Sequence, residues 1–467
     1  MSFFQQATSG SAVRAFASSD KDKIIAHFGE DSEAYVRQAI DQKFTGWIQI
    51  PAAGRYHLAK VLKSKDQKNE SLEAARKAGA SLASWMNTHM EAEVQIEGEL
   101  AEFIAEGCAL ANYKFTELFS KPNTKKNKLT KIFTPSLSDA EFTDLSVRVE
   151  ATMVARDLVN TPVLQLNAEK LAYTAKKLGE ECGFQVEIFN KKKIESLKMG
   201  GLLGVNKGSI DPPTFSIMEY KPENARNDKP IVLVGKGVVY DTGGLSLKPS
   251  TAMDTMKSDM GGAAAVIGTM VAVSKAKLDV HVVGLVPATD NRPGGNAITP
   301  GDVITMYDGS TIEVMNTDAE GRLILADALH YAKKFNPKLV IDLATLTGAA
   351  ARAIGSQGIV AMGNAQTKVF DHLSDSGHRV HERLAIFPFW DEYKDMLKSD
   401  IADMKNIGGP EAGAITAGKF LEHFTDYPYV HFDIAGPAFL SSPDGYRTKG
   451  ASGVGVRILY DYIKNKA

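Results

Sequence analysis

Apolar positions in the first third of the chain repeat with two different periods. Trp47–Pro51 and Ala92–Ile96 have the composition of strands, whereas Ser71–Met90 and Glu99–Ser120 place apolar residues at helical spacing. These segments predict a small N-terminal α/β domain over residues 1–140.

A long helix is predicted to follow this domain. Asp139–Leu158 repeats at helical spacing, and the chain soon reaches Pro162, a residue that does not continue a helix. We expect a linker helix over residues 141–160 and a larger C-terminal domain over residues 161–467.

Strand and helix patterns alternate through the C-terminal part. Ile231–Tyr240, Val280–Ala288 and Leu339–Leu346 are apolar runs typical of buried strands, and Met260–Lys275 and Leu323–Phe335 have helical patterns. This order predicts an α/β fold with a doubly wound, mixed and mostly parallel sheet. Such sheets bind ligands at the carboxyl ends of their strands.

Composition and net charge bear on the number of domains, on binding to nucleic acid or membranes, and on the expected location of the protein. The chain has 467 residues, 44% of them hydrophobic, which is enough for two domains. Its net charge of −2 gives no general attraction to nucleic acid or to an anionic membrane. Two cysteines, no secretory pattern at the start and no apolar run of about 20 residues lead us to expect a cytoplasmic protein without a membrane span.

One basic run offers an alternative role. Lys121–Lys131 contains five lysines, and a nucleic-acid site there is the rival hypothesis. Because no aromatic residue is interleaved, we expect a solvated loop and no nucleic-acid binding.

Charged residues gather where the predicted strands end. They are Lys236, Asp241, Lys248, Asp259, Asp318, Glu320 and Arg322. Each has an ordinary explanation by itself: Thr317 and Glu320 match a helix capping box, Asp259 precedes a helix, and Asp241 stands in a D-T-G-G turn.

Together, these residues indicate a metal centre. The fold would bring four carboxylates to one sheet edge, where their mutual repulsion requires positive charge. Two divalent cations about 3.5–4 Å apart would balance them. Oxygen ligands suit Mn²⁺ or Mg²⁺, and Zn²⁺ also accepts carboxylates. Lys236 would bind a cation only when neutral, which costs roughly 4–5 kcal/mol at pH 7.

Such a centre predicts hydrolysis. A water that bridges two cations becomes a hydroxide nucleophile at neutral pH, and Lys248 and Arg322 would stabilise oxyanion charge. The two glycine pairs, Gly243-Gly244 and Gly261-Gly262, would admit a close ligand or allow tight helix packing. Amide hydrolysis is favoured over phosphoester hydrolysis, because the chain lacks a P-loop and clustered histidines.

At these residues the sequence resembles the leucyl aminopeptidase family, the cytosol aminopeptidases. NTDAEGR (Asn316–Arg322) is the family signature, and VGKGVVYDTGG, LSLKP and DMGGAA match its other metal-site segments in order. ARDLVNTP, DLATLTGA, AGAITAGKFL and HFDIAG extend the resemblance over residues 150–467.

The resemblance implies a role for each charged residue. One cation would be held by Asp241, Asp318 and Glu320, together with the Asp318 carbonyl. The other would be held by Lys236, Asp241, Asp259 and Glu320. Lys248 would polarise the scissile carbonyl, and Arg322 would hold a bicarbonate that relays a proton.

The family's substrates and assembly are implied in the same way. Peptides with a free N-terminus would place their amino group at the second cation and Asp259, with Met256, Thr345, Leu346 and Gly348 along the pocket. We therefore expect a broad-specificity aminopeptidase with a preference for apolar N-terminal residues such as leucine, assembled as a homohexamer. A DNA-binding architectural protein and a two-metal hydrolase of another ester or amide are the alternatives.

Three positions depart from the commonest family pattern. Tyr240 and Thr242 stand where Phe and Ser are usual, and Tyr429 stands where Trp is common. None is an expected ligand, so these departures bear on the shape of the pocket and not on the reaction.

Overall fold

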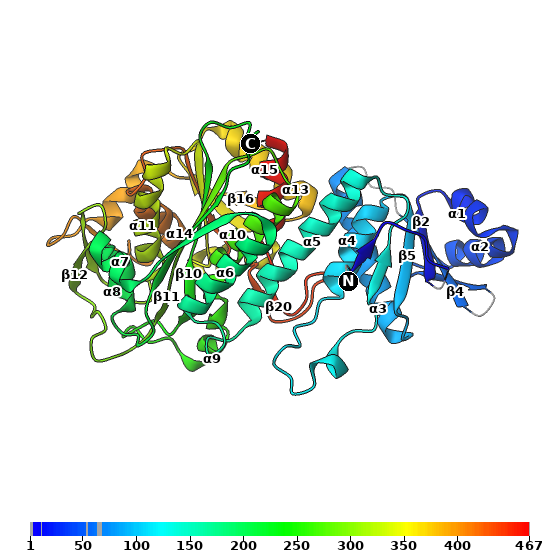
Figure 1. Cartoon of the computed structure of the whole chain (residues 1–467), viewed down its shortest axis with the longest axis horizontal. Helices are drawn as coiled ribbons and strands as arrows, with labels where there is room; N and C mark the ends of the chain where they lie inside the picture. The colour runs from blue at the N-terminus through cyan, green and yellow to red at the C-terminus, as the bar shows by residue number, and fades with distance from the viewer. Residues whose placement is uncertain (1–2, 11, 53–54, 63–67, 467) are drawn as a thin grey trace. The chain divides into compact units, whose positions relative to one another are not determined.

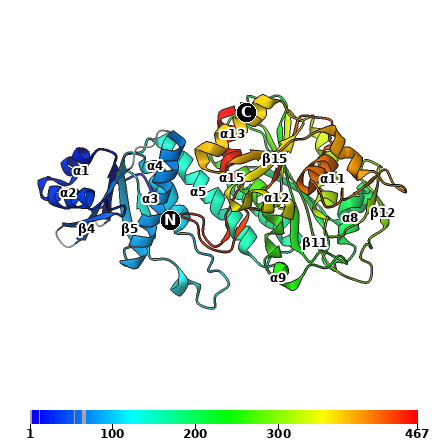
Figure 2. The ribbon, with the colours of Figure 1, turned by 180° about the vertical axis from the view of Figure 1, so that it is seen from behind.

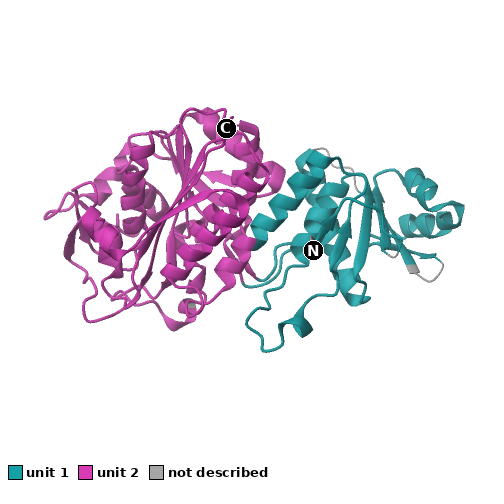
Figure 3. Cartoon of the chain, viewed as in Figure 1, with its two compact units in different colours: residues 1–153, 441–449 teal, residues 154–440, 450–467 magenta. Residues whose placement is uncertain are grey.

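The computed structural model describes residues 3–10, 12–52, 55–62 and 68–466. They form two compact units, coloured separately in Figure 3. Unit 1 comprises residues 1–153 and 441–449, and unit 2 comprises residues 154–440 and 450–467. The short return of the chain to unit 1 has no counterpart in the expected domains. There the Tyr446 hydroxyl donates a hydrogen bond to Glu73 (3.0 Å).

Unit 1 is built around a six-stranded sheet in its described residues, with strand order β1-β6-β5-β2-β4-β3. Only the β3–β4 pair is antiparallel in that sheet, as far as it is described. The strands are β1 (Phe4–Gln5), β2 (Val13–Ser18), β3 (Ile48–Ala52), β4 (Arg55–Val61), β5 (Glu93–Gly98) and β6 (Lys131–Phe133). The helices are α1 (Lys21–Phe28), α2 (Glu33–Asp41), α3 (Lys68–Thr88), α4 (Ala101–Ala111) and the start of α5 (Asp139–Asn160).

Two sequence-based boundaries in unit 1 need correction. The helix expected over Glu99–Ser120 ends at Ala111, because only its first half has the continuous apolar face that packs against α3. The lysine run Lys121–Lys131 contains a 3-10 turn at Pro122–Lys125 and ends in β6, where Lys131 pairs with Glu93 (3.4 Å).

Unit 2 contains the predicted doubly wound sheet. Its described strands run in the order β16-β15-β18-β14-β9-β11-β8-β7, with β10 pairing beside β11. The four central strands are parallel, and β7, β8 and the β15–β18 pair supply the antiparallel part. The sheet is therefore mixed and mostly parallel, as expected.

The strands of this sheet are β7 (Gln185–Phe189), β8 (Thr214–Tyr220), β9 (Ile231–Gly235), β10 (Gly237–Asp241), β11 (Val282–Asn291), β14 (Leu339–Ala344), β15 (Ile359–Gly363), β16 (Leu384–Ile386) and β18 (Tyr429–Asp433). A small sheet joins β12 (Asp302–Thr305), β13 (Thr311–Val314) and β17 (Met404–Lys405), and β19 (Phe439–Leu440) pairs with β20 (Gly450–Ala451).

Helices cover both faces of the large sheet (Figure 1 and Figure 2). Helix α10 (Gly261–Lys275) packs on β9 and β14. It also contacts the neighbouring helices α6 (Ala168–Cys182) and α15 (Val456–Lys466). Helix α11 (Gly321–Ala332) packs on β9 and β11 and contacts α8 (Gly200–Asn206) and α14 (Gly413–Glu422). The remaining helices are α7 (Lys191–Leu197), α9 (Ser250–Met253), α12 (Gly348–Ile354) and α13 (Thr367–Val380). No described helix is long and apolar enough to cross a membrane.

The apolar run Ile231–Tyr240 is two strands and not one. Strand β9 ends at Gly235, and β10 continues as a partner of β11 alone. At the break, the Lys236 amide donates to the Leu343 carbonyl (3.0 Å), and the Lys236 carbonyl accepts from the Ala263 amide (2.9 Å). The interruption places a lysine at the carboxyl edge of the sheet, next to the start of α10.

Candidate metal centre

The charged residues singled out in the sequence come together at the carboxyl edge of the large sheet. Lys236 follows β9 and Asp241 ends β10. Asp259 lies in the 3-10 turn Met256–Met260 that leads into α10, and Asp318 and Glu320 lie in the turn before α11. The placement predicted from strand order is therefore correct.

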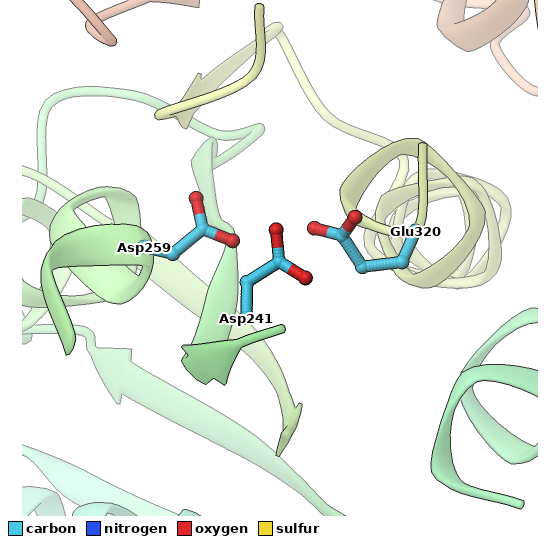
Figure 4. A group of neighbouring side chains, drawn as sticks. All are labelled: Asp241, Asp259 and Glu320. Carbon is cyan, nitrogen blue, oxygen red and sulfur yellow. The ribbon is translucent and has the colours of Figure 1, made fainter. Parts of the chain in front are cut away.

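Three of the carboxylates form a compact, buried cluster. Asp241, Asp259 and Glu320 each offer an oxygen within 4.8 Å of the others. Their carboxylates point toward one another from three separate segments (Figure 4). All three residues are at most 5% exposed, so their repulsion is weakly screened.

Lys236 lies against two members of this cluster. Its ammonium contacts Asp259 (2.7 Å) and Glu320 (2.9 Å), and it donates to the Thr345 carbonyl (3.0 Å). Burial opposes its charge, but the carboxylates of Asp259, Glu320 and Asp241 outweigh burial and raise its pKa. The ion pairs of Lys236 with Asp259 and Glu320 offset part of the negative charge.

Lys248 connects the cluster to Asp318. Its ammonium contacts Asp241 (2.7 Å) and Asp318 (2.5 Å). Burial and the charge of Asp241 raise the pKa of Asp318 to about 6, against the opposing effect of Lys248. Four carboxylates thus share two lysines, so the carboxylates outnumber the lysines of the centre.

Arg322 lies two residues after Glu320, in the first turn of α11. Its Nη1 donates to the Asn406 carbonyl (2.6 Å). Its Nε has no hydrogen-bond partner among the described residues, although the side chain is buried. Burial lowers its pKa to about 10, and the charges of Glu320 and Asp433 oppose that shift.

The capping box expected from Thr317 and Glu320 does not form. Glu320 is the N-cap residue of α11, and no side chain caps the helix. The Thr317 hydroxyl instead donates to the Gly243 carbonyl (2.6 Å) and accepts from the Ser246 amide (2.8 Å). This turn is tied to the loop after β10, which brings Asp318 close to Lys248.

The two glycine pairs have different roles. Gly243 and Gly244 have φ of +86° and +64°, a conformation that favours glycine, and the Gly243 amide donates to Asp241 (2.8 Å). At Gly262 a Cβ atom would collide with the Leu343 carbonyl oxygen. Gly262 therefore serves helix packing, the simpler of the two interpretations, whereas a Cβ at Gly261 would meet the Thr345 side chain at 3.3 Å.

Of the four predicted pocket residues, Thr345 contacts the cluster directly. Thr345 follows β14 and donates its hydroxyl to Asp259 (2.8 Å), Leu346 is half-buried, and Gly348 is exposed at the start of α12. Met256 is half-buried at the start of the 3-10 turn that carries Asp259.

Three supporting residues were missed by the sequence reasoning. The Asn291 amide donates to Asp241 (2.8 Å) and to the Thr317 carbonyl (3.0 Å). Asp433 accepts from the Leu346 amide (3.2 Å), and Asn406 contacts the segment before α11. Asn291 and Asp433 end β11 and β18, so their place in the sequence could have indicated that they lie at the site. Asn406 reaches the site only through tertiary contacts, which the sequence does not indicate.

Carboxylates that could bind a metal ion lie beside lysines at the carboxyl edge of a doubly wound sheet. This arrangement is typical of a metallohydrolase. Comparison with known proteins identifies the family within this class. Residues 153–460 match the model of the catalytic domain of the cytosol aminopeptidase family. The chain is 44% identical to a probable cytosol aminopeptidase of Chlorobium limicola over 428 residues, covering 87% of this chain and 82% of that one. A probable cytosol aminopeptidase of Chlorobaculum tepidum is 49% identical over 387 residues, with coverage of 78% and 75%.

Solved structures agree with this assignment. The bottromycin maturation enzyme BotP in complex with Mn superposes with a TM-score of 0.86 at 28% identity, covering 97% of this chain and 99% of that one. A mutant tomato leucine aminopeptidase superposes with a TM-score of 0.85 at 26% identity, with coverage of 99% and 96%. The chain belongs to the cytosol aminopeptidase family, as its motifs predicted, and is an aminopeptidase-type metallohydrolase.

Proposed function

We propose that this enzyme is a dinuclear aminopeptidase that releases N-terminal, preferably apolar residues such as leucine from peptides. The observation that carries the proposal is the buried cluster of Asp241, Asp259 and Glu320, with Asp318, Lys236 and Lys248 beside it. Peptides with a free N-terminus are the substrates that family membership supports.

The residues fit two divalent cations. Both oxygens of Glu320 are buried and have no hydrogen-bond partner among the described residues, and Glu320 forms an ion pair with Lys236 (2.9 Å). We assign one cation to Asp241, Asp318 and Glu320, and the other to Lys236, Asp241, Asp259 and Glu320. When bound, two such cations activate water for attack on a carbonyl. Lys236 must lose its proton to act as a ligand, and binding of a cation compensates that loss.

The residues around the cations have separate tasks. Lys248 is the one lysine of the centre that we do not assign as a ligand, so its ammonium is available to stabilise charge on the substrate carbonyl oxygen. Asp259 orients the substrate's amino group, which restricts cleavage to the N-terminal residue. Arg322 would hold a bicarbonate, which would supply a base for proton transfer from water. Met256, Thr345, Leu346 and Gly348 line the pocket for the peptide.

The proposal includes the identity of the metal, the location of the enzyme and its oligomeric state. Mn²⁺ is favoured by the oxygen-rich ligands and by the Mn complex of BotP, and Zn²⁺ and Mg²⁺ are the other candidates. We place the enzyme in the cytoplasm as a homohexamer that does not bind nucleic acid.

Cleavage of Leu-p-nitroanilide tests the proposal. Metal-stripped enzyme should be inactive and should recover with Mn²⁺, Zn²⁺ or Mg²⁺, whereas the N-acetylated substrate should stay intact. Activity toward the acetylated substrate would contradict the role of the free amine, and no cleavage with any metal would reject the function.

A substitution tests the metal ligands. Glu320→Ala should abolish turnover and lower the metal content while the fold remains intact, because it removes a ligand proposed for both cations. Glu219→Ala is the matched control, since Glu219 pairs with His281 (2.8 Å) away from the centre. Normal turnover in Glu320→Ala would refute the assignment.

A further inference from the structure

Asn406 supports the metal centre from a distant part of the sequence. It is 0% exposed and directly follows β17, which pairs in parallel with β13. Its own amide donates to the Glu313 carbonyl (3.0 Å), which extends this pairing by one residue. The small sheet therefore carries Asn406 to the segment that precedes α11.

The Asn406 side chain binds the backbone of that segment. Its Oδ1 accepts from the amides of Met315 (2.8 Å) and Asn316 (3.3 Å). Its Nδ2 donates to the Asn316 carbonyl (2.7 Å) and lies 3.5 Å from the Ala319 carbonyl. One planar amide thus satisfies donors and acceptors on both sides of Asp318, a pattern that the amide of an asparagine provides and an apolar side chain of similar size does not.

The main chain of the same residue holds Arg322. The Asn406 carbonyl accepts from Nη1 of Arg322 (2.6 Å). The guanidinium is therefore oriented by the same residue that holds the turn bearing Asp318 and Glu320.

We propose that Asn406 is a positioning residue of the metal centre, which sets the ligand turn at Asp318 and Glu320 with its side chain and aims Arg322 with its carbonyl. The inference rests on the proposed dinuclear function. Partners of this kind fix ligand geometry without touching the metal, and their loss typically weakens metal binding or activity by about 10- to 100-fold.

Binding of Mn²⁺ to the metal-stripped, full-length enzyme tests this role. Isothermal titration should show Mn²⁺ affinity lowered about 10- to 100-fold in Asn406→Ala. The matched control is Asn206→Ala. Asn206 is also buried, at 3% exposure, and donates to the Asp211 carbonyl (2.8 Å) and the Thr289 hydroxyl (3.0 Å).

Comparison of the Asn406→Ala and Asn206→Ala variants distinguishes a positioning role from a general contribution to stability. Both substitutions should lower the melting temperature of the metal-free protein, but only Asn406→Ala should weaken Mn²⁺ binding and lower kcat. If Asn406→Ala does not accumulate as folded protein, Asn406→Ser carries the same test, because its shorter side chain lacks the Nδ2 group that donates to the Asn316 carbonyl.

The result that overturns the proposal is a folded Asn406 variant that binds Mn²⁺ within twofold of wild type and keeps its kcat. Failure of the wild-type enzyme to bind Mn²⁺ would instead count against the dinuclear function itself. The two failures are therefore distinguishable.

Discussion

At the scale of single residues, the centre contains more carboxylates than lysines. Asp241, Asp259, Asp318 and Glu320 share the ammonium groups of Lys236 and Lys248 at distances of 2.5–2.9 Å. Because these groups are mostly buried, each charge acts strongly on its neighbours. The two lysines occupy similar positions among the carboxylates but have different proposed roles, one as a ligand and one as an electrophile.

Replacement of Lys248 by Met distinguishes these roles. We expect kcat to fall about 10²- to 10³-fold, the usual cost of removing one group that stabilises an oxyanion, while two Mn²⁺ ions still bind. Steady-state kinetics and metal analysis measure the two effects. Lys333→Met is the control, since Lys333 pairs with Asp426 (3.2 Å) outside the centre. Loss of Mn²⁺ in Lys248→Met would show that Lys248 organises the ligands instead.

At the scale of elements, close packing of helices on the sheet sets where the ligands lie. Helix α10 approaches β14 closely because Gly262 has no side chain, and the Ala263 amide at its start donates to the Lys236 carbonyl (2.9 Å). The position of Asp259, just before this helix, therefore depends on a contact between a helix and a strand.

Gly262→Ala should destabilise unit 2 by roughly 1–3 kcal/mol, the usual cost of overpacking a well-packed core. Urea unfolding measures the change. Gly204→Ala in α8 is the matched control, because a Cβ there would lie 3.5 Å from Ile304, an ordinary contact. That control should be neutral or should stabilise by up to about 1 kcal/mol, since alanine is the better helix former. Equal effects of the two substitutions would contradict the packing argument.

Helix α11 is anchored by Asp327, a carboxylate that is 1% exposed. It accepts hydrogen bonds from the amides of Leu202 (2.9 Å) and Tyr307 (3.0 Å). Burial raises its pKa to about 7 despite these bonds. A carboxyl whose pKa is higher in the folded state holds its proton more tightly there, so its contribution to stability is present at low pH and is lost as the pH rises through about 7.

The pH dependence of unfolding tests this pKa. The stability of the wild type relative to Asp327→Asn should decrease between pH 5 and pH 7, by up to about 1.4 kcal/mol per pH unit. Urea titrations of both metal-free proteins at the two pH values provide the comparison. A relative stability that rises with pH would mean that the carboxylate is ionised in the fold, with a lowered pKa.

At the scale of the whole molecule, all residues assigned to the centre and pocket lie in unit 2. Unit 1 has a core of its own and a buried ion network in which Arg148 contacts Glu102 (2.8 Å), Glu106 (3.3 Å) and Asp144 (2.8 Å). We propose that unit 1 serves assembly rather than chemistry.

Light scattering coupled to size-exclusion chromatography tests the assembly. A homohexamer of 50.5 kDa chains should have a mass of about 303 kDa, six times that of one chain. Glu320→Ala, which changes only the centre, should have the same mass. A species near 50.5 kDa at micromolar concentration would refute the hexamer.

The sequence by itself determined the class of fold, the sheet edge that carries the centre and the identity of its charged residues. Strand periodicity and the order of elements are local properties, and the rule that ligands bind where parallel strands end requires no coordinates. The NTDAEGR segment pointed to the family, which the comparisons confirm.

The tertiary structure decided what depends on contacts between distant segments. The apolar run Ile231–Tyr240 does not reveal that the strand breaks at Lys236. Similarly, the Thr317 hydroxyl bonds to the Gly243 carbonyl, in the loop after β10, instead of capping its own helix. The role of Asn406 arises from the pairing of β17 with β13. Hydrophobic periodicity records which face of an element is buried, but hydrogen bonds between segments about 70–90 residues apart are formed only when the fold brings them together.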